Sequence, residues 1–451
     1  MHIGSWRKVA AVLVGALTLS GPIVGLAAVT QSTDVGALPA PTLSVTPTSL
    51  TFNNTLLGTY TEQKFTVSNN TGSEITLQYF ARSGANGNDF TIVVDDNATC
   101  PDYDTTSGNI NLQDGHSCTI GVRFFPSALG ARSATLTLTT DAQGQDPVPG
   151  TSVNVAGNGT IGYYQVTSKG SIGYAGDAAF YGDLTNTPLN SPIVGMAAVG
   201  NNGGYWLAAA DGGVFTFGPS ATFHGSAGGL PLNKPIVGIA APLAGSGRNG
   251  YWLVASDGGI FSYGLPFFGS TGAIHLNKPM VGMASTLDGG GYWLVASDGG
   301  IFAYGDAQFY GSTGSIHLNQ PIVGMAPTPD SGGYWLVAAD GGIFAYGDAQ
   351  FYGSTGALHL VAPIISMAAM PDGGGYWFSA NDGGIFNYGT APFYGAGNAD
   401  GLTDIVSMAT NGEPTIQSLT GGVLPFLRTA HVVSGNGGFG DSNGQLEVQQ
   451  R

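Results

Sequence analysis

The chain has 451 residues, of which 75 are glycine, and its 12 basic residues stand against 28 acidic ones for a net charge of −16. A field of this sign repels nucleic acid and anionic lipid, so neither is an expected partner. The glycine content is high and no long stretch has a 3.6-residue apolar period, and both observations argue against a helical fold.

The N-terminus has the pattern of a secretory signal. Two basic residues precede an apolar run from Val9 to about Leu19, and small residues follow. We therefore expect residues 1–28 to be a signal peptide and residues 29–40 a linker. No second apolar stretch reaches the ~20 residues needed to span a bilayer. The sequence thus predicts a secreted, extracellular protein with no membrane span after signal removal.

Residues 41–159 have the pattern of a β-sandwich. Apolar and polar residues alternate, as in the segment KFTVSN, and turn clusters are spaced as in antiparallel sandwiches. Both cysteines of the chain, Cys100 and Cys118, lie in this stretch. In an exported protein we expect them to form a disulfide. A metal site built from the two cysteines and the nearby His116 is the weaker alternative.

A unit of about 42 residues recurs through residues 161–436. Each copy contains an apolar strand such as PIVGMA, a Tyr-Trp pair and an Asp-Gly-Gly turn. Degenerate turns at Lys169–Ser171 and Thr420–Gly422 bring the number of units to seven. We read four short strands in each unit (IVGMAPTP, YWLVAS, IFAYG and QFYGS), which is typical of a propeller blade.

The two ends of the repeat region favour a closed ring. The first unit begins at Gly162 with its aromatic strand and has no PIVGMA strand before it. We expect the C-terminal strand His431–Ser434 (HVVS) to complete this first blade, which would remove a free sheet edge. An open solenoid is the competing architecture. Residues 437–451 are expected to be a flexible tail.

Two resemblances to known proteins follow from these segments. The stretches LSVTPTSLTF, GTYTEQKFTVSNNTGSEITL and above all CTIGVRFFPSALGARSATLTL resemble the immunoglobulin-like domains of the ASPM/SPD-2/Hydin type, called choice-of-anchor D in bacterial exported proteins. This resemblance implies a spacer or adhesion module. The GGYWLVASDGGIF repeat is similar to units of secreted actinobacterial proteins, and neither resemblance implies catalytic residues. The expected fold is all-β, with an Ig-like β-sandwich followed by a seven-bladed β-propeller.

The Tyr-Trp pairs allow two interpretations. They could pack between neighbouring blades, or they could form stacking platforms for sugar rings. The packing interpretation is favoured because each pair is followed by further apolar residues in its strand. The tryptophans concerned are Trp206, Trp252, Trp293, Trp335 and Trp377.

One face of the predicted propeller would carry acidic turns and histidines. These residues are the turn aspartates Asp211, Asp257, Asp298, Asp340 and Asp382, and the histidines His275, His317 and His359 of the connections between blades. Aspartate suits such a turn whatever the function. The functional interpretation is a weak calcium site formed by Asp257, Asp298 and Asp340, with His317 as a further ligand. No other cofactor is expected.

The sequence contains no G-x-S-x-G, H-E-x-x-H or Walker-type motif. Our leading hypothesis is a non-enzymatic exported binding or scaffold protein whose propeller face contacts a protein or glycan at the cell surface. The alternative is a carbohydrate-active or ester-hydrolysing extracellular enzyme that uses the propeller pocket, and a third hypothesis is a surface-layer component. A set of acid and base residues that breaks the repeat symmetry would favour the enzyme.

Overall fold

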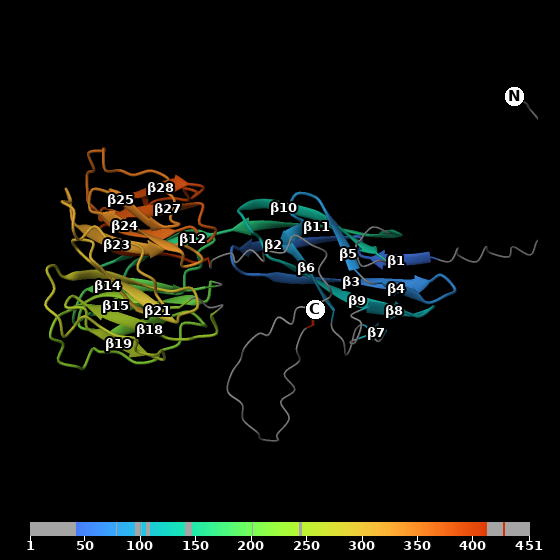
Figure 1. Ribbon diagram of the computed structural model, residues 1–451, viewed down its shortest axis with the longest axis horizontal. Coiled ribbons are helices and arrows are strands. Elements are labelled where there is room, and N and C mark those ends of the chain that lie inside the picture. The colour runs from blue at the N-terminus through green and yellow to red at the C-terminus, as the bar shows by residue number, and fades with distance from the viewer. Residues whose placement is uncertain are drawn as a thin grey trace, which may run out of the picture. The chain divides into compact units, whose positions relative to one another are not determined.

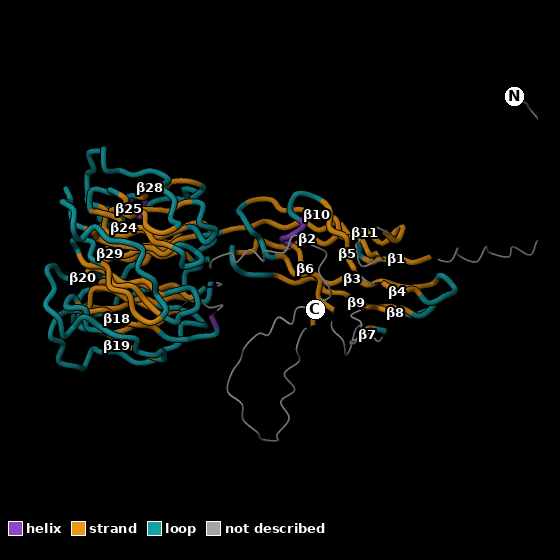
Figure 2. Tube along the Cα trace, viewed as in Figure 1, coloured by secondary structure: helices purple, strands orange, loops and turns teal. Residues whose placement is uncertain are grey.

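The computed structural model describes residues 42–77, 79–94, 100, 102–104, 109–139, 147–200, 202–242, 246–412 and 427–428. Strands dominate its regular structure (Figures 1 and 2), and helix among these residues is limited to short 3₁₀ turns such as η1 (Gly87–Asp89) and η3 (Gly397–Asp400). The all-β expectation is confirmed. The predicted signal peptide, linker and tail lie outside the described residues.

The N-terminal domain contains two main sheets. The first has the order β1-β3-β9-β6-β30, with strands Thr42–Thr46, Thr61–Asn70, Ser117–Phe124, Phe90–Val94 and Leu427–Arg428. The second has the order β2-β11-β10-β5, with strands Ser49–Leu56, Pro147–Thr160, Gly130–Thr139 and Tyr79–Ser83. A small sheet, β4-β8-β7, is formed by Ile75–Leu77, Asn109–Leu112 and Tyr103–Asp104.

One hydrophobic core joins these two main sheets. Phe65 and Val67 of β3 are buried in the same cluster as Phe52 of β2 and Val155 of β11. Burial along β3 has a period of two, since Lys64, next to Phe65, is exposed. The alternation in the sequence therefore gives each strand one core face, as expected for a sandwich.

The C-terminal repeats form six three-stranded antiparallel sheets in the described residues, coloured green to red in Figure 1. The first is β13-β12-β29, with strands Ile172–Gly176, Gly162–Thr167 and Ile405–Thr410. The next three are β14-β15-β16 (Ile193–Val199, Gly204–Ala209, Val214–Phe217), β17-β18-β19 (Ile236–Ala240, Tyr251–Ala255, Ile260–Tyr263) and β20-β21-β22 (Met280–Ser285, Gly291–Ala296, Ile301–Gly305). The last two are β23-β24-β25 (Ile322–Pro327, Gly333–Ala338, Ile343–Gly347) and β26-β27-β28 (Ile364–Ala369, Gly375–Ala380, Ile385–Gly389).

The predicted fourth strand of each unit, the QFYGS segment, is a loop rather than a strand. In the copy at 308–312 the N–H groups of Tyr310 and Gly311 both donate to the hydroxyl of Tyr334, each at 3.1 Å. Gly311 also has a φ of +142°, which suits glycine and breaks a regular extended strand. The backbone groups that would form a ladder are thus used by a side chain of the next sheet.

The strand that completes the first sheet also differs from the prediction. β29 pairs antiparallel with β12, with Tyr164 opposite Ala409. We expected this role for His431–Ser434, which lies outside the described residues, as does the predicted seventh turn at Thr420–Gly422. Because β29 belongs to the first sheet instead of opening a seventh unit, the described residues form six units and not seven.

The six sheets follow one another in a cyclic order. Their first strands lie side by side in the order β14, β17, β20, β23, β26 and β29, and β29 in turn lies beside β14. Each sheet therefore has a neighbour on both faces, including the first and the last.

Aromatic pairs hold neighbouring sheets together. The tyrosine in the second strand of each sheet packs against the tryptophan, or Tyr164, of the preceding sheet, with ring centroids 5.1–5.8 Å apart. These pairs are Tyr205–Tyr164, Tyr251–Trp206, Tyr292–Trp252, Tyr334–Trp293, Tyr376–Trp335 and Tyr163–Trp377. All five tryptophans are buried, so they pack between sheets and offer no platform to a sugar.

Candidate functional site

The turn aspartates of the repeats are engaged within their own turns. In each Asp-Gly-Gly turn the aspartate Oδ1 accepts a hydrogen bond from the N–H of the second glycine at 2.9–3.0 Å. The first glycine has a positive φ, for example +75° at Gly341. This geometry explains why aspartate and glycine recur at these positions in every intact copy.

The predicted calcium site is not assembled by these turns. No three His, Cys, Asp or Glu side chains in the described ranges lie close enough to hold a metal ion. Asp257, Asp298 and Asp340 therefore stay apart, and His317 is exposed in its connection. His275 and His359 are exposed in the same way.

The opposite end of the six sheets encloses a central cavity of about 260 Å³. The last residues of the first strands line it, among them Ala284 of β20, Met325 of β23 and Met367 of β26. The lining consists of Ala, Gly, Pro, Ser, Thr, Leu and Met, so no ionisable side chain lines the cavity in the described part of the chain. Alanine, proline and methionine side chains therefore lie beside serine and threonine hydroxyls in this cavity.

Two pairs of carboxylates lie beside this cavity, and sequence reasoning did not find them. Thr286, which lines the cavity, has its Oγ1 2.9 Å from Asp306 Oδ1 and 3.2 Å from Asp288 Oδ1. The hydrogen bond from the Gly290 N–H lowers the pKa of Asp288, whereas burial and the neighbouring Asp288 raise the pKa of Asp306. The next sheet repeats the arrangement with Asp330 and Asp348.

A third feature is a set of exposed phenylalanines, one in each connection between sheets. The six residues, called here the phenylalanine ring, are 47–63 % exposed: Phe180, Phe223, Phe267, Phe309, Phe351 and Phe393. The backbone around Phe309 is fixed on both sides. The carbonyl of Gln308 accepts from Trp293 Nε1 at 2.6 Å, and the N–H of Tyr310 donates to Tyr334. This anchoring leaves the Phe309 side chain in solvent.

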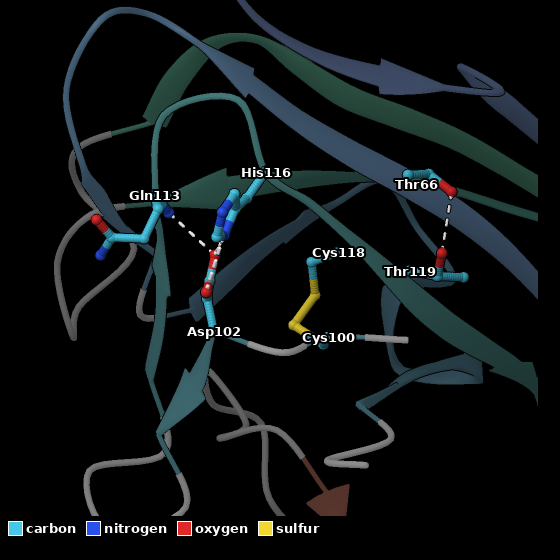
Figure 3. Close-up of a disulfide and its surroundings, with 7 residues drawn as sticks. All are labelled: Thr66, Cys100, Asp102, Gln113, His116, Cys118 and Thr119. Atoms are coloured by element: carbon cyan, nitrogen blue, oxygen red, sulfur yellow. Dashed lines mark hydrogen bonds and ion pairs between the residues drawn. A yellow bond between two sulfur atoms is a disulfide. The ribbon is translucent and has the colours of Figure 1, made fainter. Parts of the chain in front are cut away.

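The cysteines of the N-terminal domain are joined (Figure 3). Cys100 and Cys118 form a disulfide, and both are buried. His116 turns instead towards Asp102, with its Nδ1 2.9 Å from a carboxylate oxygen. Since both sulfurs are used in the disulfide, the weaker alternative of a metal site here is wrong.

Comparison with known proteins bears on the N-terminal domain. Residues 40–160 match the family described as Cep192 domain 4. The match spans the two-sheet domain and supports its assignment as an Ig-like domain of the ASPM/SPD-2/Hydin type. No curated protein matches the chain.

Proposed function

We propose that this chain is an exported, non-enzymatic binding or scaffold protein. Its C-terminal sheets would form a six-bladed propeller that presents the phenylalanine ring to a protein or glycan at the cell surface. The Ig-like domain would act as a spacer.

The cyclic order of the sheets supports the propeller. Tyr163 of the first sheet packs on Trp377 of the sixth in the same way that Tyr334 packs on Trp293. The hydroxyl of Tyr163 also donates to the carbonyl of Gly395 at 2.6 Å, as every equivalent tyrosine does with a glycine of the preceding connection. An open solenoid would leave its first and last sheets without such partners.

Export is supported by two observations. The N-terminal 28 residues have the charge and apolar pattern of a signal peptide, and a disulfide persists mainly in oxidising compartments. Among the described residues, no helix is long and apolar enough to cross a bilayer.

The phenylalanine ring is the observation that carries the binding proposal. A turn or a connection has no structural need of an exposed phenyl group, yet all six connections present one. A single exposed apolar side chain is normal on a protein surface, but recurrence of the same side chain at the equivalent place in all six connections is the reason to propose an interaction surface here. Each side chain would bury much of its remaining apolar surface in a complex, which favours association.

A glycan array and binding of the labelled protein to intact cells test the proposal. We expect the Phe309→Ser, Phe351→Ser double variant to lose binding while keeping the wild-type melting temperature. The matched control is the Ile316→Ser, Leu358→Ser double variant, which removes equally exposed aliphatic residues near the Asp-Gly-Gly turns. Equal binding by wild type and the phenylalanine variant would overturn the role of the ring.

The carboxylate pairs favour one alternative, a carbohydrate-active or ester-hydrolysing enzyme. A carboxyl group with a raised pKa next to an ionised partner is a common acid-base arrangement. Asp306 and Asp288 have these properties beside the central cavity. Hydrolysis of any member of a glycoside or ester panel, abolished in Asp306→Asn, would establish the enzyme and replace the binding proposal.

A further inference from the structure

A shared contact seals five of the six boundaries between neighbouring sheets. In each of these boundaries an aromatic residue of the third strand covers a glycine of the preceding connection. A Cβ placed on that glycine would lie only 2.3–3.1 Å from the aromatic ring. The pairs are Gly182–Phe217, Gly225–Tyr263, Gly269–Tyr304, Gly311–Tyr346 and Gly353–Tyr388. The covering ring also packs on the buried tyrosine of its own sheet, for example Tyr346 on Tyr334 at 5.8 Å.

The boundary between the sixth and the first sheet has no such aromatic residue. Gly395 is the equivalent glycine, and a Cβ there would meet nothing within 4 Å. The position of the covering ring is taken by Ala175 on β13, which pairs with Tyr163. Two residues earlier, Gly173 replaces the phenylalanine of the other third strands, but the side chain of Leu402 fills that space. The volume that the covering tyrosine or phenylalanine ring fills in the other boundaries is thus left unfilled beside Ala175 and Gly395.

This opening is a cavity of about 210 Å³, called here the seam cavity. Three tyrosines line it: Tyr163, Tyr174 and Tyr394. The Tyr163 hydroxyl is used in hydrogen bonds to the connection. Tyr174 and Tyr394 are 52 % and 41 % exposed, and within the described residues neither hydroxyl bonds to the protein. The seam cavity therefore offers apolar ring faces together with two unused hydroxyl groups.

The charge around the seam cavity is negative. Asp400, the last residue of η3, lines it and is exposed. Asp177 lies near enough to Tyr394 to raise the pKa of that phenol in addition to the effect of burial. Carboxylates beside tyrosine faces attract cations, both by direct pairing and through the rings, so an anionic ligand would be disfavoured.

We propose that the seam cavity binds an aromatic side chain of a partner polypeptide, one that stands next to a basic residue. The five sealed boundaries give the reason for an aromatic occupant, because a phenyl or phenol ring fills the same space in each of them. Asp400 and Asp177 give the reason for the neighbouring positive charge. No residue of the phenylalanine ring lines the seam cavity, although Tyr174 stacks on Phe180 at 5.4 Å. The two proposals are tested with different variants and probes, so this inference does not depend on the function proposed above.

Small phenols test this proposal on the full chain. The probes are p-cresol (neutral), tyramine (cationic) and 4-hydroxyphenylacetate (anionic), with glucose as the sugar, and binding is measured by calorimetry and ligand-observed NMR. We expect p-cresol and tyramine to bind at one site, with tyramine about threefold tighter, as one exposed charge pair would give. In the Asp177→Asn, Asp400→Asn double variant the advantage of tyramine should disappear while p-cresol binds as before.

The decisive variant is Ala175→Tyr, which restores the repeat residue and fills the seam cavity. It should abolish binding of both phenols. The matched control is Ala345→Tyr, which adds the same side chain at an exposed position of β25 beside a boundary that is already sealed, and it should bind like wild type. Binding that persists in Ala175→Tyr, no binding to wild type, or tighter binding of glucose than of p-cresol would each overturn the proposal.

A second measurement covers the case in which Ala175→Tyr fails to fold. In the wild-type protein, bound p-cresol should give nuclear Overhauser contacts to the Ala175 methyl group and to the rings of Tyr174 and Tyr394. Contacts confined to other residues, such as the lining of the central cavity, would place the phenol elsewhere and refute the seam cavity as its site.

Discussion

The hydroxyl of Tyr334 offers a direct measure of what holds neighbouring sheets together. It donates to the carbonyl of Gly311 at 2.6 Å and accepts from the N–H groups of Tyr310 and Gly311 at 3.1 Å. Tyr334→Phe keeps the ring against Trp293 and leaves these three backbone groups without their partner. Loss of such a partner costs about 1–3 kcal/mol, which corresponds to a fall in Tm of roughly 2–10 °C.

The matched control for this change is Tyr346→Phe. Tyr346 packs on Tyr334, but its hydroxyl makes no hydrogen bond to the described part of the protein, so its removal should leave Tm unchanged. Tryptophan fluorescence is the assay, because every tryptophan after the predicted signal peptide lies in the repeats. Equal melting temperatures for the two variants would refute the argument that the hydroxyl joins the sheets.

Four further outcomes are expected. Burial raises the pKa of Tyr205 to about 12, so the stability that its neutral hydroxyl gives the folded state is complete below the ordinary tyrosine pKa of ~10. This stability should be lost as the pH rises from ~10 to about 12, and Tm should fall over this range. A Tm that does not change with pH there would contradict the prediction. Reduction of the disulfide, whose cysteines are 18 residues apart, should destabilise the N-terminal domain by about 3 kcal/mol, and labelling of the unreduced, denatured chain should find no free thiol. Asp340→Ala should cost about 0.5–1.5 kcal/mol and Asp340→Asn almost nothing, because the amide oxygen can still accept from the turn N–H; equal losses of Tm would refute this. Gln165→Leu should lower the free energy of unfolding by about 1–3 kcal/mol in the wild-type protein, and by less in a protein that already carries Ser379→Val. Additive effects in a denaturant-based double-mutant cycle would show that the two residues are uncoupled.

The sequence predicted the repeat and its second and third strands because these depend on local patterns. Each GYWLVA strand is buried along its whole length, and each Asp-Gly-Gly turn connects it to the next strand. The described residues form six units rather than the predicted seven because β29 completes the first sheet, whereas the motifs TGG and HVVS lie outside the described residues. Aromatic strands and PIVG-like strands each occur six times before residue 411, which agrees with the six sheets of the described residues.

The features that bear on binding could not be predicted because they depend on contacts between sheets. Phe309 and Tyr310 are neighbours in one short run, yet one lies in solvent and the other packs against the next sheet. The difference arises from the hydroxyl of Tyr334, which is distant in sequence. The carboxylate pairs likewise join a turn to the end of a strand about 18 residues later. Only the pairing of the strands in the sheet brings these two positions together, so their spacing in the sequence does not predict the contact.

The boundary between the first and sixth sheets differs chemically from the rest, and this difference determines which sheets meet. Gln165 stands where the other sheets have Leu or Phe, and its amide donates to Ser379 Oγ at 2.6 Å while its oxygen accepts from the Gly397 N–H. Asn411, which is fully buried, acts elsewhere: it joins the two ends of the repeats within the first sheet, where its Oδ1 accepts from the N–H of Gly162. Against any of the other sheets the Gln165 amide would face apolar side chains and lose these partners, at a cost of about 1–3 kcal/mol for each group left unpaired. Six nearly identical sheets could otherwise join in several orders or between chains, so the polar pairs favour closure of one chain on itself. The first sheet also departs from the repeat at a second position, where Ala175 stands in place of a tyrosine and so opens the seam cavity.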